Sequence, residues 1–248
     1  MRLILAGLFC LPLLAQPPAP PANPAVPPLR GVNELINDYG NLRRYAADNQ
    51  KVSAPAAGED RVVFMGDSIT DGWGRSNNPA IAYPFFPGKP YINRGISGQT
   101  TAQMLLRFYP DVVAHHPKVV VFLAGTNDIA GNLGPVSMES IENNLASMSD
   151  IARANGIKVV LGSVMPVCDY HRPQTAQRPP EKIKQLNEWL KATAEKHHYI
   201  YLDYYSAMLD DKGMLRAELT LDGLHPNAAG YKIMEPLAEK AIQQALAK

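Results

Sequence analysis

The chain has few cysteines and almost no net charge, and each shortage excludes a class of protein. Its 248 residues contain two cysteines, Cys10 and Cys168, so a disulfide-stapled scaffold is excluded. No Cys-x-x-Cys or Cys/His spacing indicates a metal site. The 24 lysine and arginine residues nearly balance the 23 aspartate and glutamate residues, for a formal net charge of +1. Since this balance provides no basic surface, we expect no nucleic-acid partner, and the lack of Cys-x-x-Cys or Cys/His spacing predicts no metal.

Long hydrophobic runs are absent as well. The longest, residues 3–15, is 13 residues long, whereas a bilayer-spanning helix needs about 20. It follows a basic start at Arg2 and ends at the small residue Ala15, a pattern typical of a signal peptide cleaved before Gln16. We therefore interpret residues 1–15 as a signal peptide. The sequence predicts a secreted or periplasmic protein with no stable membrane insertion.

Proline is concentrated directly after this segment. Residues 17–28 contain seven of the 22 prolines, each of which fixes the backbone angle φ and removes a hydrogen-bond donor. Such a tract is typical of an extended linker, which we assign to residues 16–30. The rest of the chain, residues 31–248, is interpreted as one domain, because 46% hydrophobic residues suffice for a sizeable core.

Within this domain, short apolar runs alternate with stretches of helical periodicity. Strands are predicted at residues 61–65, 91–93, 118–123, 158–164 and 199–202. Helices are predicted at residues 32–49, 100–115 with a bend or break at Pro110, 137–155, 180–196, and 227–247 with a kink at Pro236. This alternation is typical of βαβ units and predicts an α/β fold in which helices cover both faces of a parallel sheet.

Four polar or glycine-rich segments stand out between these elements. They are GDSIT at 66–70, NRGISGQTT at 93–101, GTND at 125–128 and DGLHP at 222–226. The first three follow predicted strands. Because ligands bind beyond the carboxyl ends of the strands in such sheets, these segments are the candidates for a functional site.

Together the segments contain the residue types that acyl transfer needs. Ser68 becomes a nucleophile only beside a base, and His225, of a residue type whose unperturbed pKa is about 6.5, suits that task. Asp222, three residues earlier, can orient the histidine ring. Backbone N–H groups at Ser68 and Gly98 and the amide of Asn127 can donate to a developing oxyanion. Each feature alone is ordinary loop chemistry, but their order and placement predict an active site.

The four segments resemble the four blocks of the SGNH/GDSL hydrolase family and occur in the family's order. The chain is most similar to the bacterial branches related to platelet-activating-factor acetylhydrolase and lysophospholipase L1. The resemblance implies a flavodoxin-like, three-layer α/β/α fold with about five parallel strands. It implies Ser68 as nucleophile, His225 as base and Asp222 as its orienting partner. It also implies an oxyanion hole formed by the backbone N–H groups of Ser68 and Gly98 and the side chain of Asn127.

We therefore expect an exported serine esterase that needs no cofactor. Export and the absence of a long apolar lid favour short acyl groups, such as acetyl esters of small molecules or of a polysaccharide. Lysophospholipase or thioesterase action on longer chains is an alternative, and a catalytically silent carbohydrate-binding module is the alternative outside enzymes. The sequence predicts neither the substrate-binding residues nor the oligomeric state.

Two further features have open interpretations. Trp73, Tyr83, Phe85 and Phe86 follow the first segment closely and either line a substrate pocket or complete the core beside it. Cys168 is the only cysteine left after signal-peptide cleavage, and we interpret it as a structural thiol rather than a nucleophile.

Overall fold

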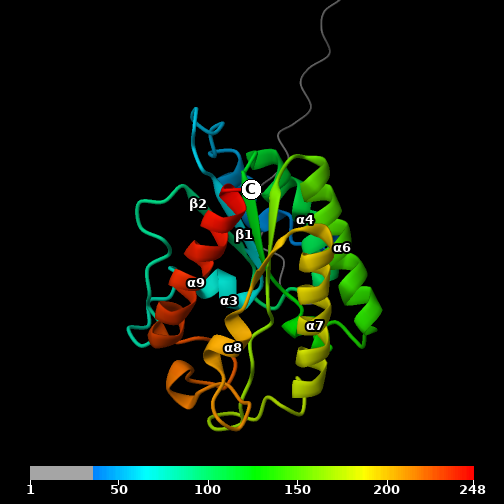
Figure 1. The fold of residues 1–248 in the computed structure, drawn as a ribbon, viewed down its shortest axis with the longest axis vertical. Coiled ribbons are helices and arrows are strands. Elements are labelled where there is room, and N and C mark those ends of the chain that lie inside the picture. Colours follow the sequence, from blue (N-terminus) through cyan, green and yellow to red (C-terminus); the bar gives the residue numbers. More distant parts are fainter. Residues whose placement is uncertain (1–35) are drawn as a thin grey trace, which may run out of the picture.

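A parallel sheet of five strands runs through the computed structural model, which describes residues 36–248 (Figure 1). The strands lie in the order β2-β1-β3-β4-β5. They are β1 (Val62–Gly66), β2 (Tyr91–Gly95), β3 (Val119–Leu123), β4 (Lys158–Gly162) and β5 (Ile200–Leu202). This is the flavodoxin-like order of a doubly wound sheet, so the predicted fold class is confirmed. The predicted signal peptide (1–15) and linker (16–30) lie outside the described residues.

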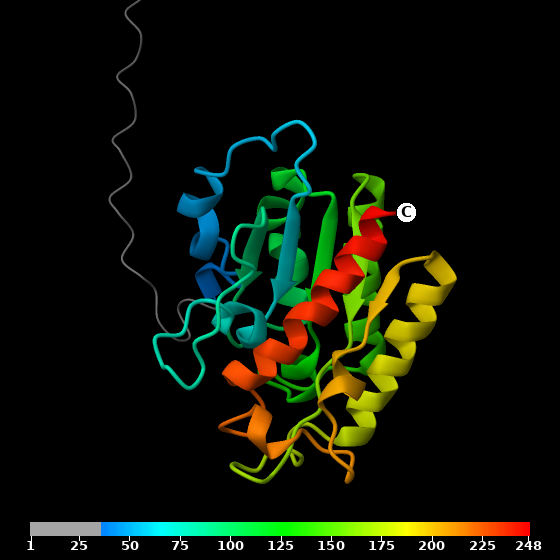
Figure 2. The ribbon, with the colours of Figure 1, turned by 60° about the vertical axis from the view of Figure 1, so that its left-hand side comes forward.

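Helices cover both faces of the sheet. Their bounds are α2 (Arg43–Asn49), α3 (Ser68–Gly72), α4 (Thr101–Asp111), α5 (Thr126–Ile129), α6 (Met138–Ala154), α7 (Pro180–His197), α8 (Tyr204–Met208) and α9 (Ala228–Leu246), with two 3₁₀ turns, η1 (Val113–His115) and η2 (Ala217–Leu219). The helices α4, α6 and α7 pack on one face, and α3, α8 and α9 pack on the other. Figures 1 and 2 show α9, in red, crossing its face of the sheet.

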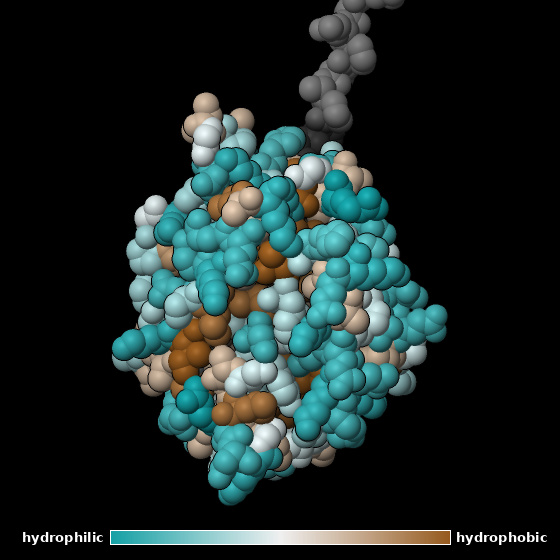
Figure 3. Space-filling view, viewed as in Figure 1, coloured by the Kyte–Doolittle hydropathy of each residue, from teal (hydrophilic) through white to brown (hydrophobic). Residues whose placement is uncertain are grey.

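The strand side chains alternate between two apolar layers. In β1, Val63 and Met65 point toward α4 and α6, whereas Val62 and Phe64 point toward α9. Because apolar side chains pack on both faces, every residue of β1 is buried. On the face seen in Figure 3, hydrophilic side chains cover the outer surface of α7, and hydrophobic ones show between α7 and α9. Among the described helices, none has both the length and the hydrophobicity that crossing a bilayer requires.

The aromatic residues after β1 belong mainly to the core. Trp73 and Phe86 are buried, and their rings pack against each other with centroids 5.0 Å apart. Phe64 and Tyr231 contact the same cluster at 5.0 and 5.1 Å. Of the two interpretations left open by the sequence, these two residues therefore support core completion. The thiol of Cys168 is buried on the same face, as expected for a structural cysteine.

The predicted helix at 32–49 is wrong in its extent, because a turn interrupts it and α2 begins only at Arg43. Asn41 adopts a left-handed conformation with φ of 52°. The Asp38 carboxylate then accepts hydrogen bonds from the backbone N–H groups of Leu42 and of the residue after it, at 2.8 and 3.0 Å. The apolar spacing continues through this turn, so periodicity alone did not detect it.

Smaller differences occur at the ends of other elements. The helix α4 continues past Pro110 to Asp111 before a 3₁₀ turn follows, so the predicted break falls just after the proline. The strand β4 ends at Gly162 rather than residue 164. The short helix α8 was not predicted, since its five residues are too few for a recognisable period.

Candidate active site

The candidate site lies at the carboxyl ends of the adjacent strands β1 and β3. From β1 the chain crosses to β2 on one side, whereas the remaining strands follow on the other side of β1. Doubly wound sheets bind ligands at this switch point. The helix α3 begins at Ser68 after β1, and α5 begins at Thr126 after β3. The topology thus brings the GDSIT and GTND segments to one edge of the sheet.

Ser68, His225 and Asp222 form a continuous chain of hydrogen bonds. The Ser68 Oγ lies 2.9 Å from His225 Nε2, and His225 Nδ1 lies 2.7 Å from Asp222 Oδ2. The other carboxylate oxygen, Oδ1, accepts the backbone N–H groups of Leu224 and His225 at 3.0 and 2.8 Å. With the proton on Nδ1 held by Asp222, Nε2 is free to accept the serine proton. An arrangement of this kind can activate a serine hydroxyl as a nucleophile.

Asp222 carries a negative charge in this arrangement. Partial burial alone would raise the pKa of its carboxyl, but hydrogen bonds from the His225 ring and backbone outweigh it and hold that pKa well below the ordinary range. The backbone carbonyl of Asp222 also accepts the side-chain amide of Gln174 at 3.1 Å. An ionised carboxylate fixed on both sides favours the imidazolium that forms when the histidine takes up a proton.

The turn from β1 into α3 requires a glycine. A Cβ atom on Gly66 would lie 2.1 Å from Thr70 Oγ1 and 2.8 Å from the Leu123 carbonyl oxygen, so any side chain would push α3 and β3 away. The next residue, Asp67, caps α3 by accepting the backbone N–H of Ile69 at 3.0 Å. As a result, Ser68 is the first residue of the helix, with its backbone N–H among those that have no intrahelical partner.

The amide of Asn127 has a defined orientation. Its Oδ1 accepts a hydrogen bond from Asn132 Nδ2 at 2.9 Å, and its Nδ2 donates to the backbone oxygen of Gln99 at 3.0 Å. An amide nitrogen carries two hydrogens, so a second donor remains for a ligand. Gly98 precedes Gln99 and has φ of +80°, and a Cβ there would meet no atom within 4 Å. Its backbone therefore borders open space, and the positive φ accounts for the glycine.

Two further residues hold segments of the site in place, and the sequence did not indicate either of them. Arg178, which is buried, donates from Nε to Thr126 Oγ1 at 3.2 Å and from Nη1 to Gln174 Oε1 at 3.0 Å. Since Gln174 contacts Asp222, this arginine links the start of α5 to the carboxylate loop. The only signal was an i,i+4 pair of polar residues in a loop. Asn132 lies in the loop after α5 and gave no signal at all.

No group of three or more potential metal-ligating side chains occurs within residues 36–248. The His225 and Asp222 pair is engaged with Ser68 instead, as described above.

Comparison with known proteins places these features in context. The model of the GDSL-like lipase/acylhydrolase family matches residues 64–233. A GDSL-like lipase of Bacteroides thetaiotaomicron has a crystal structure with 41% identity and a TM-score of 0.76, over 84% of this chain and 99% of that one. An acetylxylan esterase of Geobacillus stearothermophilus is 24% identical over 71% of this chain and 90% of its own length. The esterase TesA of Pseudomonas aeruginosa is 28% identical, over 70% and 83% respectively.

The buried carboxyl of Asp67 makes stability depend on pH. Burial raises its pKa from 3.8 to about 6, although the Ile69 N–H bond and the charges of His225 and Arg178 oppose the rise. The folded state thus holds this proton more tightly than the unfolded chain does. The protonated Asp67 carboxyl therefore contributes stability below pH 3.8. As the pH rises to about 6, the free energy of unfolding falls by about 3 kcal/mol.

We predict that Asp67→Asn, which keeps the acceptor for Ile69 and removes the charge, gains stability relative to the wild type as the pH rises from 4 to 7. Urea unfolding of both proteins at each pH measures the difference in free energy of unfolding. Titrating groups that do not interact with Asp67 cancel in that difference. An equal difference at both pH values would contradict the prediction.

Proposed function

The chain belongs to the GDSL-like lipase/acylhydrolase family and is a carboxylic ester hydrolase, and from this we propose that Ser68 is its nucleophile, His225 its general base and Asp222 the group that orients His225. One observation carries the proposal. The three side chains are joined by hydrogen bonds of 2.9 and 2.7 Å although Ser68 and His225 lie 157 residues apart.

The reaction follows from this geometry in two halves. The Ser68 Oγ attacks the ester carbonyl carbon while His225 Nε2 takes the hydroxyl proton. His225 then gives that proton to the departing alcohol oxygen as the carbon–oxygen bond breaks, which leaves an acyl-enzyme. A water molecule, deprotonated by the same nitrogen, attacks the acyl carbon, and its proton returns to Ser68 as the acid leaves.

Negative charge develops on the carbonyl oxygen in both halves. We propose that the backbone N–H groups of Ser68 and Gly98 and the second amide hydrogen of Asn127 donate to this oxygen. The fixed orientation of the Asn127 amide supports the assignment, because a donor held in place before reaction needs no reorganisation in the transition state.

For the substrate we propose short acyl esters, in particular acetyl esters carried by a carbohydrate. The similarity to an acetylxylan esterase supports this class. A second candidate is a longer acyl chain, as in a lysophospholipid or thioester. The exposed apolar side chains of Leu221, beside Asp222, and Leu133, beside Asn132, favour that alternative. Chain-length preference distinguishes the two.

We further propose that the protein is exported, with a signal peptide at 1–15, a linker at 16–30 and a single hydrolase domain at 31–248. The basic start, the 13-residue apolar run and the closing Ala15 support this division. We predict that the protein recovered outside the cytoplasm begins at Gln16, which N-terminal sequencing tests. Recovery of the intact N-terminus from the cytoplasm alone would contradict it.

The first functional prediction concerns Ser68→Ala and a series of p-nitrophenyl esters from acetyl to dodecanoyl. The variant loses turnover by several orders of magnitude on every ester, because no other group supplies the nucleophile. In the wild type, kcat/KM is highest for acetyl and falls with chain length. A maximum at a medium or long chain would favour the second candidate substrate. A Ser68→Ala variant with wild-type turnover would contradict the mechanism itself.

A further prediction concerns the oxyanion donor. Asn127→Ala lowers kcat by roughly 10²–10³-fold with KM little changed, because the donor acts mainly in the transition state. The control is Asn187→Ala. The Asn187 amide is also buried, but it bonds only the backbone N–H and carbonyl of Val164, at 2.8 and 2.9 Å. A similar loss of kcat in both variants would show a general structural effect and contradict the assigned role.

A further inference from the structure

A wholly buried arginine on α4 contacts the ends of two strands beside the site. The Arg107 side chain is 0% exposed. Its Nη2 donates to the carbonyl of Gly66 at 3.1 Å, and its Nη1 donates to the carbonyl of Arg94 at 2.8 Å. The Nε donates to Gln99 Oε1, and Nη1 also pairs with Asp111 Oδ2 at 3.0 Å. Three of the four acceptors therefore lie on β1, on β2 or in the loop after β2.

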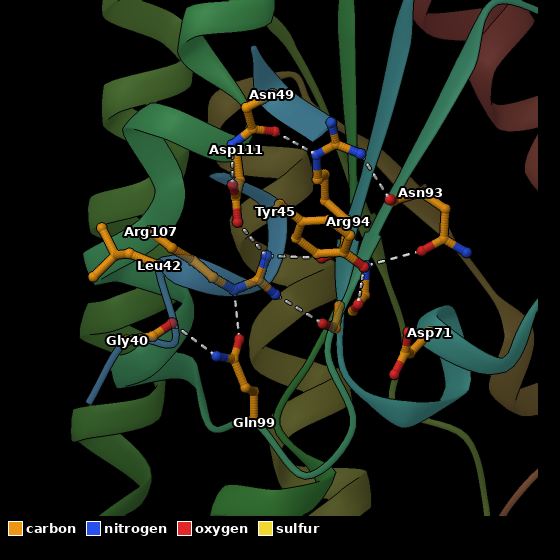
Figure 4. Close-up of polar contacts among 12 residues, drawn as sticks. Gly40, Leu42, Tyr45, Asn49, Asp71, Asn93, Arg94, Gln99, Arg107 and Asp111 are labelled. Carbon is orange, nitrogen blue, oxygen red and sulfur yellow. Dashed lines mark hydrogen bonds and ion pairs between the residues drawn. The ribbon is translucent and has the colours of Figure 1, made fainter. Parts of the chain in front are cut away.

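Gln99 extends this contact to the proposed oxyanion donors. Figure 4 shows its side chain between Arg107 and the backbone of Gly40, to whose oxygen Nε2 donates at 2.9 Å. The backbone of Gln99 directly follows Gly98, and its carbonyl accepts the Asn127 amide at 3.0 Å. A displacement of this one side chain would therefore move both the Gly98 N–H and the acceptor that orients Asn127.

Burial of a guanidinium group is expensive and must be compensated. Burial lowers the pKa of Arg107, and the nearby Asp111 carboxylate opposes that shift. Asp111 alone would satisfy an ion pair, yet the fork of the guanidinium also holds two strand-end carbonyls and the Gln99 amide. A lysine at this position keeps the charge but lacks the planar fork, so it cannot bond acceptors in these directions at once.

We propose that Arg107 is a positioning residue for the oxyanion hole. Through Gln99 it holds the Gly98 N–H and the Asn127 amide at a fixed distance from the turn that carries Ser68. It touches neither substrate nor the reacting atoms. The inference rests on the proposed function, because it assigns a purpose to Arg107 only if the oxyanion forms at these donors.

The structure provides a matched control in Arg61. This arginine is also buried, and it donates to Glu59 Oε1, to the carbonyl of Ser53 and to the carbonyl of His115, at 2.8, 2.8 and 3.0 Å. It immediately precedes β1, at the amino end of the sheet, whereas the site lies beyond the carboxyl ends. Its replacement removes a comparable buried fork without touching the site.

The test compares Arg107→Lys with Arg61→Lys in the full chain, with thermal unfolding and with kcat and KM on a p-nitrophenyl ester. Both variants lower Tm. Arg107→Lys also lowers kcat, by roughly 10–100-fold with KM little changed, because a small displacement of the donors weakens transition-state binding more than substrate binding. Arg61→Lys keeps the wild-type kcat. Equal kcat values in the two variants would overturn the inference.

Gln99→Met provides a second route if Arg107→Lys does not fold. It keeps the length of the side chain and removes both amide contacts, so we expect the same selective loss of kcat. The double variant then loses no more kcat than the larger single loss, because both residues act through one contact. Losses that multiply would overturn the inference.

Ser68→Ala, measured alongside, separates the two proposals. An active Ser68→Ala overturns the proposed function and this inference together. An inactive Ser68→Ala with full kcat in Arg107→Lys and Gln99→Met overturns only the inference about Arg107.

Discussion

The site depends on how closely three segments approach one residue, Gly66 at the end of β1. On one side, the absence of a Cβ lets Thr70 of α3 and the carbonyl of Leu123 in β3 come into contact with it. On the other side, its carbonyl accepts the backbone N–H of Ile96 at 3.0 Å and the guanidinium of Arg107 at 3.1 Å. The turn that carries Ser68, the neighbouring strand β3 and the loop after β2 are therefore packed around the same peptide unit. A looser turn would separate the groups that ester hydrolysis needs to have together.

The histidine reaches this point from the far end of the chain by its own set of contacts. Tyr231 of α9 donates to the carbonyl of Ile69 in α3 at 2.8 Å, so the helix after His225 is bonded to the helix that begins at Ser68. The turn before the histidine is bonded to the preceding loop through the Cys168 N–H and the Gly223 carbonyl, at 2.9 Å. A Cβ on Gly223 would lie 2.3 Å from the Cys168 carbonyl oxygen, so the two segments are in backbone contact.

The sheet and the serine–histidine–aspartate chain were accessible from the sequence, for different reasons. Strands buried on both faces read as continuous apolar runs, and the four polar segments stand in a recognisable order. The features that the sequence did not predict depend on contacts between distant segments or on a local turn. Arg107 and Asp111 are both buried and stand i,i+4 on α4, but no local rule indicates that the arginine bonds Gly66 and Gln99. The turn before α2 was missed because Asn41 lies within an unbroken apolar period.

The segment before β1 helps to hold the loops of the site in place. Residues 38–49 precede the region that the family model matches, yet the hydroxyl of Tyr45 bonds the carbonyl of Gly95 and the carbonyl of Gly40 holds the Gln99 amide. Asn49 bonds Asp111 at 2.7 Å. A protein truncated to the start of β1 would retain Ser68, Asp222 and His225 but would lose contacts that hold the loops beside them. In this chain the unit that must fold around the reaction is therefore larger than its four motifs and includes the helix α2.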